Sequence, residues 1–402
     1  MAVPIKQLRI SPEEHKARCD ALVEHLQVND LSGAVLFDNA YVQYYSGFSF
    51  IPTERPMAFL INSKGQRGLF VPRLELEHAQ ANSLIDRVDS YIEYPHDPHP
   101  TAALLRLMHD LGMVGGTDTK IGADDDGYPW VFGYRGPSLS ELTQRKIVPV
   151  RGFIEDRLMA KSPAELRLIE ESCVWGNLAH TLLQRYTKPG ATETEVSQRA
   201  SDEATRAMMD AIGPIYRAQS NYGTGASAGY RGQIGRNAAI PHALANNIVF
   251  RDGDVLVTGA GATMWGYNSE LERTMVIGKA SPEVKTMFEH MLALQETAFD
   301  AIKPGEPCSN VDRKVRAYYE KHDLMPYWKH HVGHNIGLRY HEAPFLDIGD
   351  DTILQPGMLF TVEPGLYAPA LGGFRHSDTV VVTETGIEIY TYYPRDLESL
   401  TI

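Results

Sequence analysis

The chain of 402 residues is poor in cysteine and lacks both a basic cluster and a long apolar run. Its three cysteines, Cys19, Cys173 and Cys308, are far apart and do not have the spacing of a metal finger. This usage suits free thiols in a reducing compartment. No apolar run could span a bilayer, and the N-terminus lacks the charged-then-apolar pattern of a signal peptide. We therefore expect a soluble, cytoplasmic protein that makes no membrane contact.

The charge balance argues against a nucleic-acid partner. The formal net charge is −13 at pH 7, and no local run of Lys and Arg offsets it. Surfaces that bind nucleic acid are basic, because they must meet a polyanion. With 43% hydrophobic and 22% charged residues, the composition is that of an ordinary globular protein. The length is more than one small core needs, so two domains are expected.

The first part of the chain, residues 1–156, has the pattern of an alternating α/β domain. Ser11 as N-cap and Pro12 at the first helical position open a helix over residues 11–26. Apolar runs predict strands at 34–37, 56–62 and 68–71, and helical patterns follow at 74–81 and 101–111. This half contains no cluster of His, Asp or Glu, so we interpret it mainly as scaffold. Arg55, just before a strand, is either a solvated surface residue or a group that reaches a neighbouring site.

A domain boundary is expected near residue 157, which gives a second domain over residues 157–402. Just after it, Lys161-Ser-Pro-Ala-Glu165 has the pattern of a capping box with proline at the first helical position. Further helices are predicted at 193–209, 282–302 and 310–321. Two of the turns have the same sequence, Lys-Pro-Gly, at residues 188–190 and 303–305. The repetition hints at an internally duplicated α/β layout.

The stretch 254–278 has the pattern of a hairpin, with two β-branched runs around a short connection that contains Gly, Tyr and Asn. In its second run Asn268, Glu270 and Glu272 are spaced two apart, which places them on one face of a strand. Acids on one face of a core strand are costly to desolvate unless a cation or strong donors meet them. The alternative is a solvent-facing strand with ordinary surface acids.

The last quarter of the chain concentrates chemically active side chains. Residues 328–342 contain four histidines among glycines, a composition that forms neither a good core nor a good helix. Glu363 ends a predicted strand against a Pro-Gly turn, a place where functional carboxylates are often presented. A last strand is predicted over residues 374–383. Alternation places Arg375 and Ser377 on one of its faces and His376 on the other.

These motifs resemble, in order and spacing, those of the pita-bread superfamily, which includes creatinase, prolidase, aminopeptidase P and methionine aminopeptidase. The matching pieces are Pro241-His242, the hairpin GAGATMWGYNSELERT, GHNIGLRYHE, LQPGMLFTVEPGLY and GGFRHSDTVVVTETG. Residues 39–48 resemble part of the creatinase/prolidase N-terminal domain. The resemblance implies an α/β (α+β) protein, with an N-terminal domain of that type over 1–156 and a pita-bread catalytic domain over 157–402.

The resemblance also implies a metal site, but this chain departs from the pattern. Metallopeptidases of the superfamily hold two ions with two Asp, one His and two Glu. The corresponding positions here are Gly259, Glu270, His334, Glu363 and Ser377, so Gly259 and Ser377 replace expected ligands. A full dinuclear centre is therefore not expected. Two alternatives stay open: no metal, or one divalent ion (Mn, Zn, Co or Fe) held by Glu270, His334 and Glu363.

The main functional hypothesis follows the resemblance to creatinase, which hydrolyses a C–N bond without metal. It implies His242 as acid/base, Glu272 and Glu363 as the acids that hold a substrate cation, and a homodimer in which Arg55 reaches the neighbouring site. Glu270 and Arg339 are further substrate-binding candidates. In the alternative with one metal ion, His341 would polarise the scissile carbonyl or stabilise the oxyanion. The expected enzyme is thus a hydrolase of a small amidino, amide or peptide-like amino-acid derivative.

Other functions remain open at this stage. His242, His334, His341 and Glu363 also fit the pattern of an Xaa-Pro dipeptidase or aminopeptidase that uses one divalent metal. Relatives further include a lyase that acts on a small sulfonium substrate, and binding proteins of the same fold that have lost catalysis. In every case the resemblance points to a small-molecule partner.

Overall fold

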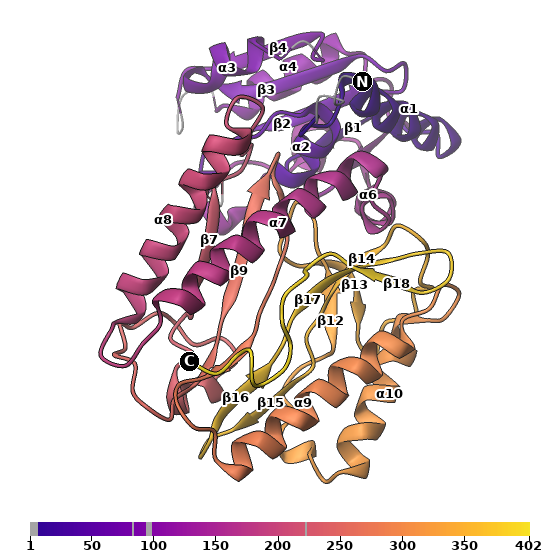
Figure 1. Ribbon diagram of the computed structural model, residues 1–402. Helices are drawn as coiled ribbons and strands as arrows, with labels where there is room; N and C mark the ends of the chain where they lie inside the picture. Colours follow the sequence, from indigo (N-terminus) through magenta and orange to yellow (C-terminus); the bar gives the residue numbers. More distant parts are fainter. Residues whose placement is uncertain (1–6, 83, 94–98, 222) are drawn as a thin grey trace, which may run out of the picture. The chain divides into compact units, whose positions relative to one another are not determined.

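A computed structural model describes residues 7–82, 84–93, 99–221 and 223–402 of the chain (Figure 1). Two compact units are present, one formed by Ile10–Arg157 and the other mainly by Leu158–Ile402. Within the described ranges, no helix is both long enough and apolar enough to cross a bilayer.

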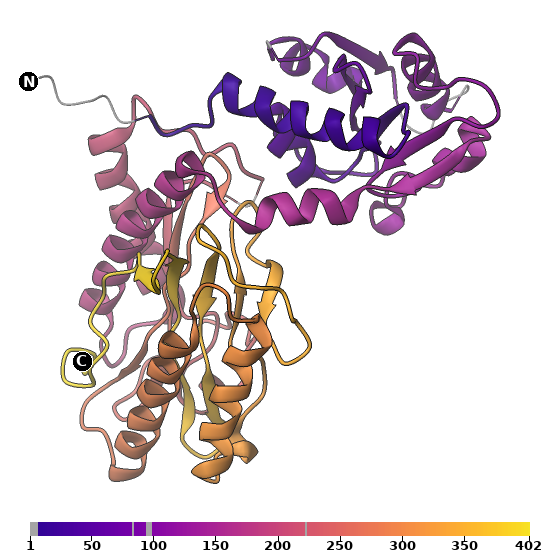
Figure 2. The same ribbon diagram turned by 90° about the vertical axis from the view of Figure 1, so that its right-hand side faces the viewer.

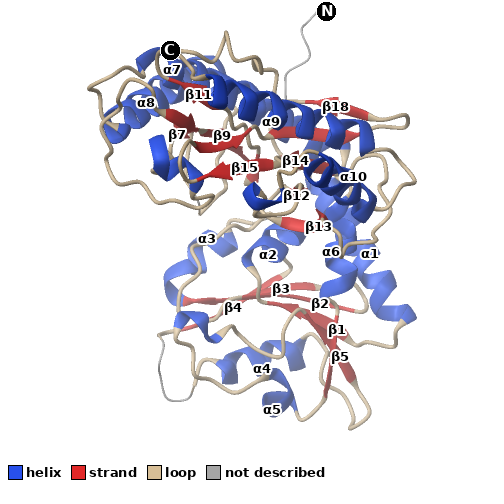
Figure 3. Ribbon diagram, turned by 90° about the horizontal axis from the view of Figure 1, so that it is seen from below, coloured by secondary structure: helices blue, strands red, loops and turns tan. Residues whose placement is uncertain are grey.

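The N-terminal unit is a mixed six-stranded sheet with the strand order β4-β3-β2-β1-β5-β6. Strands β1, β2 and β3 are antiparallel to one another, whereas β4, β5 and β6 each run parallel to a neighbour. Figure 3 shows α2 on one face of this sheet and α4 with α5 on the other. The elements are α1 (Pro12–Val28), β1 (Gly33–Leu36), α2 (Asn39–Ser46), β2 (Ala58–Asn62), β3 (Arg67–Pro72), α3 (Leu76–Gln80), β4 (Arg87–Tyr91), α4 (Thr101–Asp110), β5 (Lys120–Ala123), α5 (Leu139–Thr143), β6 (Lys146–Pro149) and α6 (Arg151–Met159).

Local sequence signals explain why several of these elements begin where they do. Ser11 caps α1, and its side chain accepts a hydrogen bond from the backbone N–H of Glu14. The apolar face of α4 packs into a core formed with the sheet, where Leu104 and Leu107 are buried against Phe70. Sequence analysis assigned no helix to residues 39–46, which form α2 with Asp38 as N-cap.

The second unit has two helix pairs, each packed on part of a strongly curved set of strands (Figures 1 and 2). Helices α7 and α8 lie beside β7 and β9, and α9 and α10 lie beside strands of the C-terminal part. The elements are α7 (Pro163–Tyr186), α8 (Glu193–Ile212), β7 (Ala226–Gly229), β8 (Val255–Val257), β9 (Gly259–Met264), β10 (Tyr267–Asn268), β11 (Thr274–Val276), α9 (Pro282–Ala301), α10 (Cys308–Lys321), β12 (Gly333–Asn335), β13 (Glu342–Leu346), β14 (Leu359–Val362), β15 (Gly365–Ala368), β16 (Gly372–Arg375), β17 (Asp378–Val382) and β18 (Ile387–Ile389).

In each half of this unit, the turn that joins the two helices of a pair is hydrogen-bonded to a segment later in the chain. Gly190 and Gly305 both adopt left-handed backbone, with φ of 85° and 89°. Gly190 donates its N–H to the carbonyl of Phe250, and Gly305 donates to that of Leu354, each at 2.9 Å. Isolated bridges follow in both halves, between Thr192 and Val249 and between Pro307 and Ile353. The shared hydrogen-bond pattern supports an internal duplication beyond the Lys-Pro-Gly motif itself.

The hairpin predicted over residues 254–278 is present. Strands β9 and β10 pair across a two-residue turn at Trp265 and Gly266, and β8 pairs with β11 further from the turn. Both turn residues have positive φ, 53° and 84°, as the tightest hairpin turns require. Between the two paired regions, Ala260 bridges to Leu271, so the segment that carries the acids stays attached to β9.

The prediction of one continuous strand over residues 374–383 is wrong, because this segment changes its strand partners between residues 375 and 378. Strand β16 pairs with β15, whereas β17 pairs with β14 and β18. At the break, Ser377 exchanges two backbone hydrogen bonds of 3.0 Å with Glu272 of the hairpin. The break therefore joins the hairpin to the C-terminal strands at the point where acidic residues gather.

A buried ion pair fixes the start of the second unit to its C-terminal strands. Lys161 Nζ lies 2.7 Å from Glu342 Oε2, and the two side chains are only 1% and 3% exposed. The same ammonium donates to Asn335 Oδ1 at 2.7 Å and to the carbonyl of Leu158 at 2.6 Å. Every proton of the ammonium thus has an acceptor, as a buried charge requires.

We expect Lys161→Met to destabilise the protein by about 3–5 kcal/mol, because Glu342 would be left as an uncompensated buried charge. Equilibrium unfolding in urea measures the change. Lys16→Met is the matched control, since its pair with Asp20 is 66% and 62% exposed and exposed pairs contribute roughly 0–1 kcal/mol. Equal effects of the two substitutions would contradict the role given to Lys161.

Candidate active site

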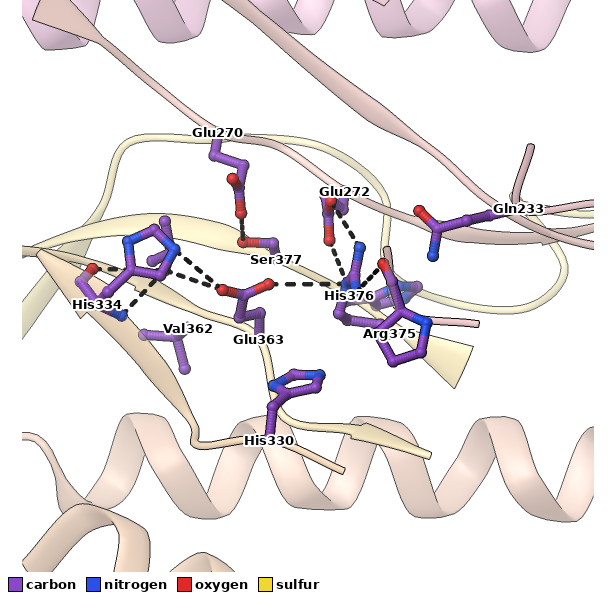
Figure 4. Close-up of polar contacts among 12 residues, drawn as sticks. Gln233, Glu270, Glu272, His330, His334, Val362, Glu363, Arg375, His376 and Ser377 are labelled. Atoms are coloured by element: carbon purple, nitrogen blue, oxygen red, sulfur yellow. Dashed lines mark hydrogen bonds and ion pairs between the residues drawn. The ribbon is translucent and has the colours of Figure 1, made fainter. Parts of the chain in front are cut away.

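Three side chains that lie in or shortly after three different strands converge in the second unit, as Figure 4 shows. Glu270 follows β10, His334 is the central residue of β12, and Glu363 comes directly after β14. One ligand atom of each lies within 4.8 Å of the others. One imidazole nitrogen and two carboxylate oxygens form a donor set suited to a divalent transition-metal ion.

The hydrogen bond that His334 makes on its far side fixes its tautomer. Nδ1 lies 3.0 Å from the carbonyl of Asn335, which can only accept, so Nδ1 carries the proton. Nε2 is buried and lies 3.2 Å from Glu363 Oε1. No described residue forms a hydrogen bond of good geometry with Nε2. Burial alone would lower the pKa of His334, but Glu363 and Glu270 outweigh burial and raise it to about 9. Nε2 therefore either carries a proton toward Glu363 or offers its lone pair to a cation.

The two carboxylates of this cluster titrate in opposite directions. Burial, together with the charges of Glu363 and Glu272, raises the pKa of Glu270 to about 7, although Ser377 Oγ donates to its Oε1 at 2.8 Å. Burial would likewise raise the pKa of Glu363, but His334 and Arg375 hold it well below its ordinary value. Glu363 is thus firmly ionised, whereas Glu270 lacks enough nearby positive charge to favour its ionised form. A cation bound beside Glu270 would stabilise that form.

Glu272 faces two arginines of its own chain. It is buried, and Arg375 meets it with two parallel hydrogen bonds, Nε to Oε2 and Nη2 to Oε1, the latter at 2.8 Å. Arg231 Nη2 donates to the same Oε1 at 2.7 Å. Sequence analysis expected Glu272 to hold a substrate cation, whereas in the structure guanidinium groups of the chain already surround it.

Two histidines border the cluster. The ring of His341 stacks on that of His334, with centroids 3.7 Å apart and planes at 18°. Burial, with His334 as the next contribution, lowers the pKa of His341 to about 4, so this ring is neutral near pH 7. His242 and Glu363 line one pocket of about 270 Å³. His341 lines that pocket and an adjoining one of about 380 Å³.

The other predicted site residues lie elsewhere or act differently. Arg55 belongs to the N-terminal unit, where Glu54 and Glu93 accept from its guanidinium at 2.7 and 2.8 Å. The backbone N–H of Arg339 donates to Glu342, and Arg339 is not among the residues that line the two pockets. His376 lies on the opposite face from Ser377 and bonds through its ring to the backbone of residues 274 and 395.

A second ion would find few ligands in this site. Gly259 offers no side chain, and a Cβ built there would have only Glu272 Oε1, at 3.8 Å, within 4 Å. Ser377 uses its hydroxyl to donate to Glu270. Both positions that sequence analysis identified as departures from the superfamily pattern therefore contribute no anionic ligand.

Sequence reasoning missed the two arginines as site residues. Arg375 could have been found, because strand alternation already placed it on the face of Ser377. Arg231 lies in a loop with φ of 50°, and no sequence periodicity connects it to Glu272. Only the folded chain brings that pair together.

The curved strands, the two helix pairs and the acidic cluster with its histidine are features of the pita-bread superfamily. The chain belongs to metallopeptidase family M24, whose profile matches residues 167–384. The creatinase/prolidase N-terminal domain matches residues 18–156. The fold and the superfamily expected from the sequence are thereby confirmed.

The relatives include two Xaa-Pro dipeptidases from Pyrococcus. The chain is 28% identical over 389 residues to the Xaa-Pro dipeptidase of Pyrococcus furiosus, with 95% of this chain and 99% of that protein covered. It is 27% identical to the Xaa-Pro dipeptidase of Pyrococcus horikoshii, with 94% and 97% covered.

Solved structures of a dipeptidase and a prolidase are also similar to this chain over almost its whole length. Dipeptidase PepE from Mycobacterium ulcerans matches with a TM-score of 0.80 and 25% identity, covering 98% of this chain and 100% of that one. The prolidase from Pyrococcus horikoshii OT3 matches with a TM-score of 0.77 and 26% identity, covering 95% and 99%. These similarities favour the Xaa-Pro peptidase alternative over the creatinase-like main hypothesis. They also confirm the expectation of a hydrolase, and family M24 is a metallopeptidase family.

Substitution of Arg375 should lower the free energy of unfolding more than substitution of Arg231, the other arginine that contacts Glu272. Arg375 is 3% exposed at its side chain, and we expect Arg375→Met to cost roughly 3 kcal/mol because a buried bidentate pair is lost. Arg231 is 52% exposed, and Arg231→Met should cost about 0–1 kcal/mol. Unfolding midpoints of the two variants measure the difference. A larger loss for Arg231→Met would show that Arg231 supports the fold.

Proposed function

We propose that this enzyme hydrolyses the amide C–N bond of a small Xaa-Pro dipeptide and uses one divalent metal ion. The observation that carries the proposal is the cluster of Glu270, His334 and Glu363, whose ligand atoms lie within 4.8 Å of one another. The buried Nε2 of His334, with Nδ1 bonded to a carbonyl, fits a metal ligand. The similarity to two Xaa-Pro dipeptidases from Pyrococcus adds support.

Glu270, His334 and Glu363 would hold the ion in this proposal. The chemistry that a divalent ion supplies there is a lowered pKa of a water molecule and polarisation of the scissile carbonyl. The described residues offer three protein ligands, so positions would remain for water and substrate. Ser377 orients Glu270 through a 2.8 Å hydrogen bond to Oε1.

The remaining residues would handle the proton and the developing charge. His341, held by stacking on His334, would donate a hydrogen bond to the oxyanion that forms from the scissile carbonyl. His242, which lines the same pocket as Glu363, would give a proton to the departing proline nitrogen. Glu272 would act by holding Arg375 and Arg231 at the pocket wall.

The creatinase-like hypothesis has less support from this geometry. It requires acids that hold a substrate cation, yet Glu272 already accepts from two guanidinium groups. A second guanidinium-type cation at this carboxylate would face their repulsion. The homodimer in which Arg55 reaches a neighbouring site stays a prediction, as does the contribution of Arg339 to substrate binding.

We expect hydrolysis of the dipeptide Gly-Pro when Mn²⁺ or Co²⁺ is supplied, and loss of activity after treatment with a chelator. His334→Ala should lower kcat/KM by at least about 100-fold, because the nitrogen ligand is lost. His109→Ala, an exposed residue of the N-terminal unit, is the control. Full activity of the chelated protein, or turnover of an amidino compound but of no Xaa-Pro dipeptide, would refute the proposal.

Metal stoichiometry gives a test that does not depend on turnover. The purified protein should bind one divalent ion per chain in a calorimetric titration, since Gly259 and Ser377 supply no carboxylate. Gly259→Asp should create a second, weaker site, because a side chain there has room and points toward Glu272. Gly386→Asp adds the same charge at a position with no atom within 4 Å of a new Cβ and serves as control. Two ions in the unaltered protein would contradict the proposed site.

A further inference from the structure

The side chain of Glu193, the first residue of α8, is only 2% exposed and connects two loops of the second unit. Its Oε1 accepts a hydrogen bond from the backbone N–H of Gly232. Its Oε2 accepts from the backbone N–H groups of Asn246 and Ile248, at 3.1 and 3.4 Å. Hydrogen bonds from N–H groups to a carboxylate are charge-assisted and stronger than neutral ones. One carboxylate thus ties the turn at Gly232 to the segment 240–248.

Both loops carry residues that line the pocket of about 270 Å³. Arg231 directly precedes Gly232, and His242 belongs to the other loop. The two loops also touch, since a Cβ built on Gly232 would lie 2.1 Å from the carbonyl oxygen of Leu244. The carboxylate therefore fixes the relative position of two parts of the pocket wall.

The segment 240–248 buries little of its own surface. Its exposed residues are His242, Leu244, Ala245, Asn246 and Asn247. Near the acidic cluster, Arg375 Nη1 donates to the carbonyl of Pro241 at 3.4 Å, whereas the far end of the segment is bonded to Glu193. Segments with few buried contacts open locally at a low free-energy cost. The bonds to Glu193 are therefore expected to limit how far this segment moves.

The helix that Glu193 begins does not depend on its carboxylate. Thr192 is the N-cap of α8, and its side chain accepts from the backbone N–H of Glu195. Glu195 also supplies a negative charge to the first turn, where the helix dipole favours one. The carboxylate of Glu193 thus contributes to the two loops rather than to the cap of α8.

The duplicated half of the unit shows that the backbone connection does not need the carboxylate either. Glu193 donates its N–H to the carbonyl of Ile248 at 2.9 Å. In the other half Cys308, the first residue of α10, donates its N–H to the carbonyl of Thr352, also at 2.9 Å. Each of the two residues follows the glycine of its Lys-Pro-Gly turn at the same spacing. The fold therefore makes the same connection there with a side chain that has no carboxylate.

We propose that Glu193 is a positioning residue, whose carboxylate keeps His242 at the pocket wall, where His242 gives a proton to the departing proline nitrogen. The inference rests on the proposed function, because Glu193 acts through the proton donor of that same site. Glu193 is not among the residues that line the two pockets. Loss of its carboxylate should therefore slow the proton transfer and leave the binding of the ion unchanged.

Hydrogen exchange of the full-length protein tests the tether without any substrate. Glu193→Gln should speed exchange of the amides in segment 240–248 at least about 10-fold, because its NH₂ group cannot accept from the N–H donors that it would face. Residues 352–354, which make the matched connection in the other half, should keep their rates. Glu195→Gln, the same change at an exposed residue of the same helical turn, is the control. Unchanged exchange of segment 240–248 in Glu193→Gln would overturn the proposal.

Turnover of Gly-Pro with Mn²⁺ tests the link to His242. Glu193→Gln should lower kcat at least about 10-fold with little change in KM, because the proton donor is displaced while the other pocket residues stay. Combined with His242→Ala it should cause no further loss, since both substitutions remove the same proton transfer. Glu193→Asp keeps the charge and should restore part of kcat. Calorimetric titration with Mn²⁺ should give the same stoichiometry for Glu193→Gln as for the unaltered protein, which shows that the variant is folded.

Failure of this inference is distinguishable from failure of the proposed function. Hydrolysis of Gly-Pro in which the losses from Glu193→Gln and His242→Ala multiply would leave the proposed function standing and overturn the role of Glu193. An unaltered protein that does not hydrolyse Gly-Pro would refute the proposed activity. In that case faster exchange of segment 240–248 in Glu193→Gln would still support the tether, and unchanged exchange would refute both.

Discussion

The repulsion among three carboxylates is the constraint on which the structure of this site depends. Glu270, Glu272 and Glu363 face one another in a largely buried pocket, and each needs positive charge or donors to remain ionised there. Glu272 receives it from two arginines and Glu363 from His334 and Arg375. Among the described residues, the Glu270 carboxylate accepts a hydrogen bond only from the Ser377 hydroxyl, and burial together with the charges of Glu363 and Glu272 raises its pKa. A cation between Glu270, His334 and Glu363 is the simplest way to complete the balance.

The duplicated scaffold explains how residues that are about 60 to 90 positions apart in the sequence come together at this point. One helix pair supports the hairpin that carries Glu270 and Glu272, and the other supports the strands that carry His334 and Glu363. The two parts join where the backbone of Ser377 pairs with that of Glu272. The break between β16 and β17 is therefore not a defect of the sheet. It lets one segment serve both halves and directs Arg375 and Ser377 to neighbouring acids.

Much of this arrangement could be predicted from the sequence, because the relevant signals are local. The Pro-Gly turn marked Glu363 as the end of a strand, and alternation placed Ser377 and His376 on opposite faces. Partner exchange at Ser377 could not be predicted, since it depends on a hairpin more than a hundred residues earlier. Arg231 could not be predicted as a partner of Glu272 either, because a loop residue with positive φ has no periodicity from which its contacts follow. Arg375 could have been predicted, since alternation already placed it on the face of Ser377.

Charge neutrality also accounts for the way this chain departs from the dinuclear pattern. Four carboxylates with two divalent ions are balanced, and so are two carboxylates, Glu270 and Glu363, with one ion. The third acid, Glu272, is balanced separately by the buried guanidinium of Arg375. In the proposed one-ion site, the loss of two anionic ligands, at Gly259 and Ser377, would be matched by the loss of one cation.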